Sequence, residues 1–121
     1  MFDHVMVNVS SKSDGMKFYT PVLQTLGIKV LYDQDQYAAY GVDSFHFWLR
    51  EAQGEDVTRK AHLAFSAGSR QQVDQFYQTA LAAGGRSNGA PGLREHGPAY
   101  YAAYVFDLEG NNIEAVCTKS V

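Results

Sequence analysis

The chain has 121 residues, a composition typical of globular proteins and a net charge of −3. This length suits one domain that buries a core without disulfides. No basic run predicts nucleic-acid binding, and no apolar run is long enough to cross a membrane. The single cysteine, Cys117, cannot form an internal disulfide. We therefore expect a cytoplasmic protein whose partners are neither nucleic acid nor membrane.

The sequence contains two copies of one pattern, displaced by 58 residues. The matched positions are His4 with His62, Phe18-Tyr19 with Phe76-Tyr77, and Gly27 with Gly85. Further along, the Tyr-Ala-Ala-Tyr segment at 37–40 matches the one at 101–104 at a displacement of 64. The additional residues fall in a loop, where insertions are well tolerated.

Each copy predicts a strand, a helix and three further strands. In copy one the last three strands cover about 28–33, 37–42 and 45–50; in copy two they cover about 86–88, 100–106 and 112–118. The first helix should be capped by Ser13 or Asp14 and should end at Gly27, and Pro21 should kink it or delay its start. The second should lie between a Ser69 capping box and Gly84.

The predicted order is therefore βαβββ twice: repeat one at 1–50, a polar connection at 51–60 and repeat two at 61–121. This is an α+β fold in a single domain. A four-stranded sheet covered by a helix on one face leaves its other face bare. Two curved mixed sheets, side by side with the helices outside, would enclose a cup lined by the bare faces.

Three candidate metal ligands share that bare face. His4 and His62 point away from the large apolar side chains of their strands, because successive side chains in a strand alternate. Glu114 lies opposite the apolar Ile113, Ala115 and Cys117. Two imidazoles and a carboxylate suit Zn, Ni, Co, Mn or Fe better than Ca. Glu114 is also the candidate catalytic residue, because it would both ligate the metal and move protons. The metal, with open positions, would act as a Lewis acid.

The two strand-start histidines, the Phe-Tyr pair of each helix and the closing YYAAYVFDLEGNNIEAV resemble the glyoxalase/bleomycin-resistance/extradiol-dioxygenase (vicinal-oxygen-chelate) superfamily. The resemblance implies that His4, His62 and Glu114 are metal ligands. It also implies a fourth ligand position within 45–50. Depending on the alignment, that position is Trp48, which cannot ligate, or His46, which can.

Four residues are candidates for binding the substrate. Arg94 and His96 lie in the loop before the seventh strand. Arg94 can bind a carboxylate through two hydrogen bonds, and His96 can carry a proton. Tyr101 is expected at the mouth of the cup, and Trp48 in its wall.

By resemblance, the chain is a glyoxalase-like, lactoylglutathione-lyase-related enzyme that uses a divalent metal. It would be a lyase or isomerase acting on a small molecule chelated through vicinal oxygens, such as a glutathione hemithioacetal. One alternative is a metal-free drug-binding protein of the bleomycin-resistance type, and another is an Fe(II) oxygenase. We also expect a homodimer, with each site formed within one chain or shared between two.

Overall fold

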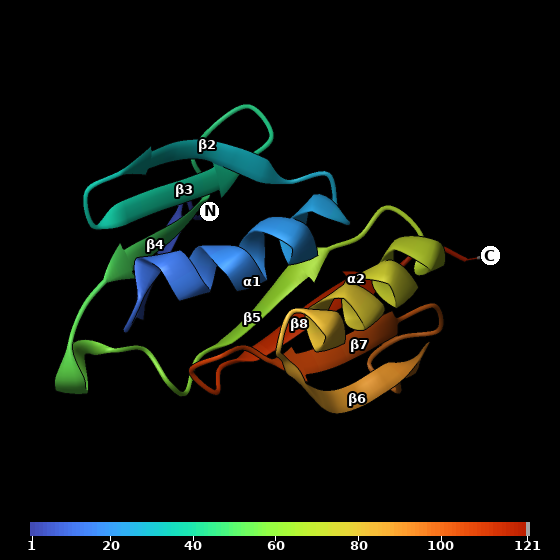
Figure 1. The fold of residues 1–121 in the computed structure, drawn as a ribbon. Coiled ribbons are helices and arrows are strands. Elements are labelled where there is room, and N and C mark those ends of the chain that lie inside the picture. Colours follow the sequence, from blue (N-terminus) through green and yellow to red (C-terminus); the bar gives the residue numbers. More distant parts are fainter. Residues whose placement is uncertain (121) are drawn as a thin grey trace.

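The computed structural model describes residues 1–120 and contains the βαβββ order twice (Figure 1). Module one contains β1 (Val5–Val9), α1 (Lys12–Gln24), β2 (Lys29–Gln34), β3 (Tyr37–Gly41) and β4 (Phe47–Glu51). A short 3₁₀ turn, η1 (Gly54–Asp56), follows. Module two contains β5 (His62–Ser66), α2 (Arg70–Ala82), β6 (Arg86–Leu93), β7 (Tyr101–Phe106) and β8 (Asn112–Cys117).

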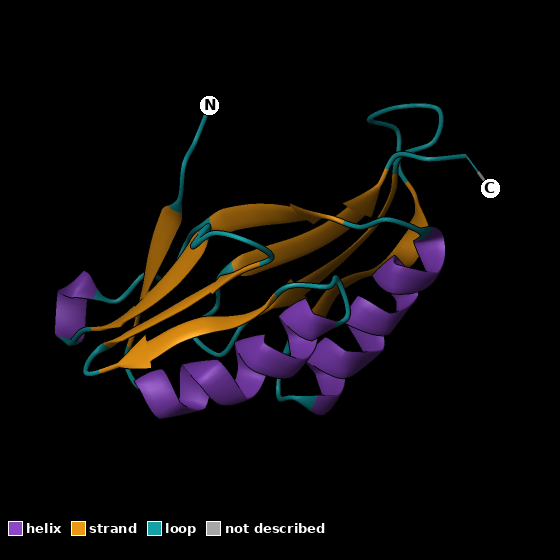
Figure 2. Cartoon of the chain, turned by 90° about the horizontal axis from the view of Figure 1, so that it is seen from above, coloured by secondary structure: helices purple, strands orange, loops and turns teal. Residues whose placement is uncertain are grey.

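The two modules have the same sheet topology. Sheet A has the strand order β1-β4-β3-β2, and sheet B has the order β5-β8-β7-β6. In each sheet the first and last strands of the module pair in parallel, and the remaining pairs are antiparallel. Both helices lie on one side of the sheets, so the opposite, outer faces stay uncovered (Figure 2). The predicted α+β fold of two βαβββ repeats with mixed sheets is confirmed, and the face of each sheet that the helices leave bare is called its outer face below.

The start of α1 differs from the prediction. The N-cap is Ser11, whose hydroxyl accepts a hydrogen bond from the backbone N–H of Asp14 at 3.1 Å. The expectation that Ser13 or Asp14 caps this helix is therefore wrong. Pro21 lies inside the helix and does not delay its start, which is at Lys12.

The second helix begins as predicted. Ser69 is its N-cap and accepts a hydrogen bond from the backbone N–H of Gln72 at 3.2 Å. Its apolar positions recur at helical spacing and give one buried stripe. That stripe consists of Val73, Phe76, Tyr77 and Ala80. Neither helix has the length and apolar character that crossing a membrane would require.

One hydrophobic core joins the two modules. Phe47 of β4 packs edge to face against Phe65 of β5, with ring centroids 5.4 Å apart. Phe18 of α1 and Phe76 of α2 are both fully buried in the same cluster. Cys117 also lies in this core, 1% exposed. The sheets are thus held side by side by a continuous core rather than by the 51–60 connection alone.

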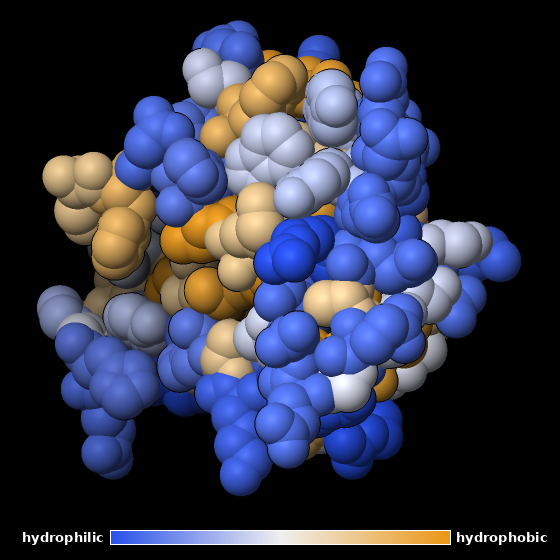
Figure 3. Space-filling view, turned by 90° about the vertical axis from the view of Figure 1, so that its left-hand side faces the viewer, coloured by the Kyte–Doolittle hydropathy of each residue, from blue (hydrophilic) through white to orange (hydrophobic). Residues whose placement is uncertain are grey.

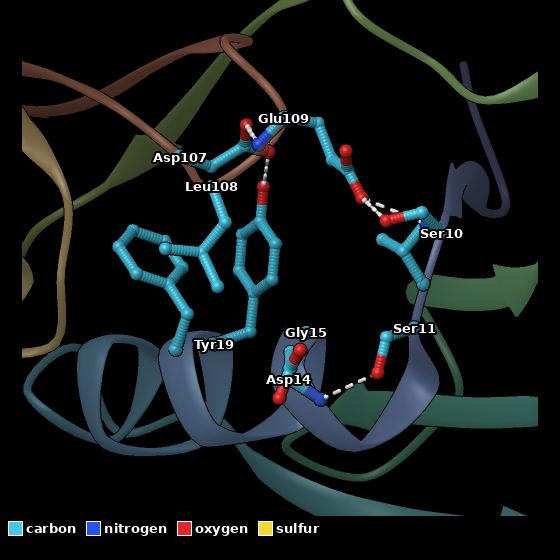
Figure 4. Close-up of a pocket in the computed structure, with 10 residues that line it drawn as sticks. Ser10, Ser11, Asp14, Gly15, Tyr19, Asp107, Leu108 and Glu109 are labelled. Carbon is cyan, nitrogen blue, oxygen red and sulfur yellow. Dashed lines mark hydrogen bonds between the residues drawn. The ribbon is translucent and has the colours of Figure 1, made fainter.

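A polar junction adds to that core where the start of α1 meets the β7–β8 turn (Figure 4). The buried Tyr19 hydroxyl donates to Asp107 Oδ2 at 2.5 Å, and Asp107 Oδ1 accepts from the backbone N–H of Asn111. Beside them, Glu109 accepts hydrogen bonds from the backbone and hydroxyl of Ser10. A cavity of about 180 Å³ remains between these groups. Because its polar walls satisfy one another, we interpret this cavity as part of the module joint.

Strand register corrects the predicted match between the Tyr-Ala-Ala-Tyr segments of β3 and β7. Glu114 pairs with Tyr104, whereas Trp48, on the corresponding strand of module one, pairs with Ala39. Ala39 therefore corresponds to Tyr104, and the third strands of the two modules are displaced by 65 residues. The Tyr-Ala-Ala-Tyr match at a displacement of 64 is wrong by one position. A slip of one residue exchanges the two faces of a strand, so the paired tyrosines are not equivalent.

Candidate functional site

The outer face of sheet B holds a buried carboxylate with two partners. Glu114 is 2% exposed, although it points away from the helices. The ring Nε2 of His62 donates to Glu114 Oε1 at 2.9 Å, and the Tyr100 hydroxyl donates to Oε2 at 2.5 Å. The His62 side chain itself is 55% exposed. A carboxylate can be buried here because both of its oxygens are paired.

The same carboxylate perturbs the neighbouring phenols. Its hydrogen bond with Tyr100, together with partial burial, raises the pKa of Tyr100 to about 12. Burial is the larger cause, and the negative charge of Glu114 the smaller one, of a raised pKa of Tyr104. Both phenols therefore remain protonated hydrogen-bond donors at neutral pH.

The predicted substrate residues of module two lie on different sides of sheet B. The Arg94 guanidinium lies over the Tyr104 ring, 5.3 Å from its centroid, on the outer face. His96 contacts the edge of Tyr100, with ring centroids 5.0 Å apart. Tyr101 points to the opposite side, where its hydroxyl donates to Asp74 of α2 at 2.7 Å. Arg94 and His96 therefore lie near Glu114, whereas Tyr101 belongs to the contact between sheet and helix.

The outer face of sheet A is aromatic instead of polar. Trp48 is surrounded there by Tyr32, Tyr37 and Phe45, with centroid distances of 5.6 to 6.1 Å. The Phe45 and Tyr37 rings stand nearly perpendicular to the indole, at 85° and 88°. These rings line a pocket of about 470 Å³, which Met6, Asp3 and His4 complete. The predicted wall residue Trp48 thus lies at the centre of an aromatic pocket.

His4 does not join the pair in sheet B. It lies just before β1, and its Nδ1 is hydrogen-bonded to Asp3 at 2.7 Å. That bond holds the pKa of the Asp3 carboxyl below its usual value. Among residues 1–120, no three His, Cys, Asp or Glu side chains come together as a metal site would require. Within one chain, then, His62 and Glu114 meet and His4 stays on the other sheet.

Strand register also shows which residue of module one corresponds to Glu114. Glu114 is paired with Ala64 across β5, and Trp48 is paired in the same way with Met6 across β1. Trp48 is therefore the structural counterpart of Glu114. His46 precedes β4, and its ring Nδ1 is hydrogen-bonded to the Asp3 carbonyl at 2.8 Å.

Tyr100, expected only near the mouth of the cup, and Tyr104 are the site residues for which the sequence predicted no role. Tyr100 falls at the start of the strand expected over 100–106, whereas the structure places it in the loop directly before β7. Tyr104 was aligned with the inward-facing Tyr40, because the two copies share a Tyr-Ala-Ala-Tyr segment. A prediction based on strand pairing, with Glu114 opposite residue 104, would have found it.

Large apolar side chains remain at the surface of module one, and two of them, Met6 and Phe45, line the aromatic pocket. Figure 3 shows hydrophobic atoms gathered in a hollowed part of one side of the molecule, framed by hydrophilic ones. The exposed large hydrophobic residues of module one are Met1, Phe2, Met6, Val42 and Phe45. Apolar groups gathered in this way are typical of ligand or protein contact sites.

Comparison with known proteins agrees with this architecture. The family model described as Glyoxalase/Bleomycin resistance protein/Dioxygenase superfamily matches residues 1–115. The chain therefore belongs to this superfamily, as the closing segment and the strand-start histidines predicted. A search of curated proteins finds no significant match.

Solved structures resemble the chain over nearly its whole length. A glyoxalase/bleomycin resistance protein from Albidiferax ferrireducens T118 is 32% identical with a TM-score of 0.86, over 98% of this chain and 99% of that one. A glyoxalase-related enzyme from Fulvimarina pelagi is 19% identical with a TM-score of 0.76, over 97% and 87%. A fosfomycin resistance protein from Listeria monocytogenes is 16% identical with a TM-score of 0.71, over 98% and 93%. The last two likenesses concern the fold alone.

Proposed function

We propose that the protein is a glyoxalase-like, metal-dependent enzyme of the lyase or isomerase type, acting on a small molecule with neighbouring oxygen atoms. The metal ligands would be His62 and Glu114, joined by His4 of a second copy of the chain. The observation that supports this most strongly is a buried carboxylate hydrogen-bonded to an exposed histidine on an uncovered sheet face.

The His62–Glu114 pair fits a divalent ion. Its Nε2 and Oε1 atoms lie 2.9 Å apart. Two ligands about 2.1 Å from one metal and at right angles to each other are separated by about 3.0 Å. An ion could therefore replace the shared proton with little movement of either side chain. Tyr100 holds the second carboxylate oxygen, which is how outer partners commonly orient a metal ligand.

A second copy would supply what one chain lacks. His4 lies in the aromatic pocket on the outer face of sheet A together with the exposed Met6 and Phe45, and contact with a partner would cover these apolar side chains. Placing this face against sheet B of another copy would bring His4 toward His62 and Glu114 and bury the apolar residues. The bound metal would supply Lewis acidity to the substrate oxygens. Glu114 and the Tyr100 hydroxyl would orient the substrate and hold protons beside it.

Calorimetric titration of metal-free protein with Zn²⁺, Ni²⁺ and Mn²⁺ tests this function. We expect one ion per chain, and we expect His62→Ala to abolish binding. His46→Ala is the matched control, since His46 is also an exposed histidine at a strand end but bonds only to the Asp3 carbonyl. Unchanged metal stoichiometry in His62→Ala would contradict the assignment.

A second candidate function, metal-free binding of a small molecule, is favoured by the aromatic pocket. Trp48 replaces a potential ligand at the position equivalent to Glu114, and the pocket volume of about 470 Å³ suits a small ligand. Trp48 is the only tryptophan of the chain, so its fluorescence reports directly on this pocket. Saturable quenching by small aromatic compounds in the presence of EDTA, without any metal binding, would favour this candidate.

A further inference from the structure

Arg94 is held in a fixed position on the outer face of sheet B. Its Nη2 donates to the Ala90 carbonyl at 2.6 Å, and its Nη1 donates to the Leu93 carbonyl at 3.4 Å. Its guanidinium also lies over the ring of Tyr104. Two of its five N–H donors are used by the backbone, and three remain for other acceptors. The group is ordered before any ligand arrives, which reduces the entropy lost on binding.

Two glycines make this position possible. A Cβ atom at Gly89 would lie 2.9 Å from the Tyr104 ring and 3.3 Å from Arg94 Nη2. A Cβ atom at Gly92 would lie 3.0 Å from Arg94 Nη1. A side chain at Gly92 would require the guanidinium to shift, and one at Gly89 would require the Tyr104 ring to shift as well. The two glycines in the segment GAPG thus leave room for Arg94 above the sheet.

Arg94 has no carboxylate partner among the residues that the structure describes. Glu114, one strand away, is already bonded to His62 and Tyr100. A half-buried guanidinium without an anion is well suited to bind one, and its planar fork matches a carboxylate.

We propose that Arg94 and Tyr104 form a carboxylate-binding subsite beside His62 and Glu114. The substrate is then a small organic acid with an oxygen on the carbon next to its carboxylate, a 2-oxo or 2-hydroxy acid. Tyr104 pairs directly with Glu114, and neighbouring strands lie about 4.8 Å apart. A ligand that reaches from Arg94, over Tyr104, to the His62–Glu114 pair must therefore be short, with its second oxygen close to its carboxylate. The role of that second oxygen rests on the proposed function, whereas carboxylate binding by Arg94 does not.

The test measures binding of pyruvate, lactate and lactamide to the full chain in EDTA, by NMR chemical-shift titration. Lactate and lactamide differ in charge but little in shape. We expect the two acids to bind and the amide to bind at least about tenfold more weakly, since bonds to a charged group are stronger than neutral ones. Because EDTA removes metal, failure of the metal site would not change this result.

Two variants and one matched control locate the binding. Arg94→Gln should weaken lactate binding at least about tenfold, and Gly92→Ala should weaken it by displacing the guanidinium. Arg86→Gln is the control, because Arg86 lies over Phe106 at 5.0 Å in the same way but is exposed at the other end of β6. Equal binding of lactate and lactamide, no binding of either acid, or equal losses in Arg94→Gln and Arg86→Gln would overturn the proposal.

Discussion

The outer faces of sheets A and B share one topology and one register but differ in chemistry. Where sheet B has Glu114 opposite Ala64, sheet A has Trp48 opposite Met6. One face carries a histidine–carboxylate pair with tyrosines and an arginine, and the other carries an aromatic pocket. The repeat therefore fixes where an outward side chain lies, and the residue at that position decides what the face can bind.

This difference suggests a division of labour. The polar face would hold a metal ion and the charged end of a ligand, and the aromatic face would hold the apolar end and supply His4. In the proposed site neither face carries all three ligands, so the two faces would have to come together to bind the metal.

The difference between the two faces can be removed at one position by replacing Trp48 of sheet A with glutamate, the residue at the equivalent position of sheet B. Trp48→Glu places a carboxylate at the position equivalent to Glu114, and a further ligand should tighten metal binding at least about tenfold, or 1.4 kcal/mol. Trp48→Gln controls for loss of the indole. Calorimetric affinities for Zn²⁺ and Ni²⁺ measure the effect, and equal affinity in both variants would mean that the two positions do not face the same ion.

Loosening the joint between the modules should affect stability more than metal binding. Tyr19→Phe removes the buried donor to Asp107 and should lower the free energy of unfolding by about 1–2 kcal/mol. Urea denaturation followed by circular dichroism measures this. A variant as stable as the wild type would show that the apolar core alone holds the sheets together.

Tyr100 and Tyr101 are neighbours in sequence, but their hydroxyls lie on opposite sides of sheet B, so paired variants test which side binds the metal. Tyr100→Phe removes a donor to Glu114 and should change metal affinity by a few-fold. Tyr101→Phe removes a bond to Asp74 on the helix side and should lower stability by about 0.5 kcal/mol, with metal affinity unchanged. If Tyr101→Phe altered metal binding as much as Tyr100→Phe, the assignment of faces would be wrong.

Alkaline pH should reveal the buried phenol at the joint. Burial and the charge of Asp107 raise the pKa of Tyr19 well above 10 in the folded protein. Its contribution to stability is therefore complete below the unfolded pKa of about 10 and is lost as pH rises toward the folded value. Above pH 10 the stability of Tyr19→Phe should fall less steeply, by up to about 1.4 kcal/mol per pH unit. Parallel slopes for both proteins would contradict this.

Much of the fold could be predicted because strands, helices and the repeat leave periodic patterns. The βαβββ order and the Ser69 cap follow from such patterns. The faces of β7 could not be predicted in this way. Its Tyr-Ala-Ala-Tyr segment has tyrosines at both ends, an odd number of residues apart, so one must face inward and one outward whatever the register. The segment GAPG of β6 was also missed, since glycine and proline are uncommon inside strands.

For the site, sequence placed His62 and Glu114 on one face, and the structure brings them into contact. Whether His4 joins them depends on how sheets are arranged in space, which alternation along a strand does not specify. Alternation also could not decide whether Trp48 or His46 corresponds to Glu114, because it assigned both side chains to the same face. Strand pairing decides it, since Trp48 pairs with Met6 as Glu114 pairs with Ala64.

The proposed function requires the faces of sheets A and B from different copies of the chain to form one metal site. Co-expression of His4→Ala and His62→Ala chains with different affinity tags allows the mixed dimer to be purified and its bound Zn²⁺ counted. Each parent variant alone should bind no ion. We expect the mixed dimer to bind one ion, held by His4 of the second chain and by His62 and Glu114 of the first. A mixed dimer without metal, or a stable monomer that binds a full equivalent, would show that the two faces do not share a metal site between copies.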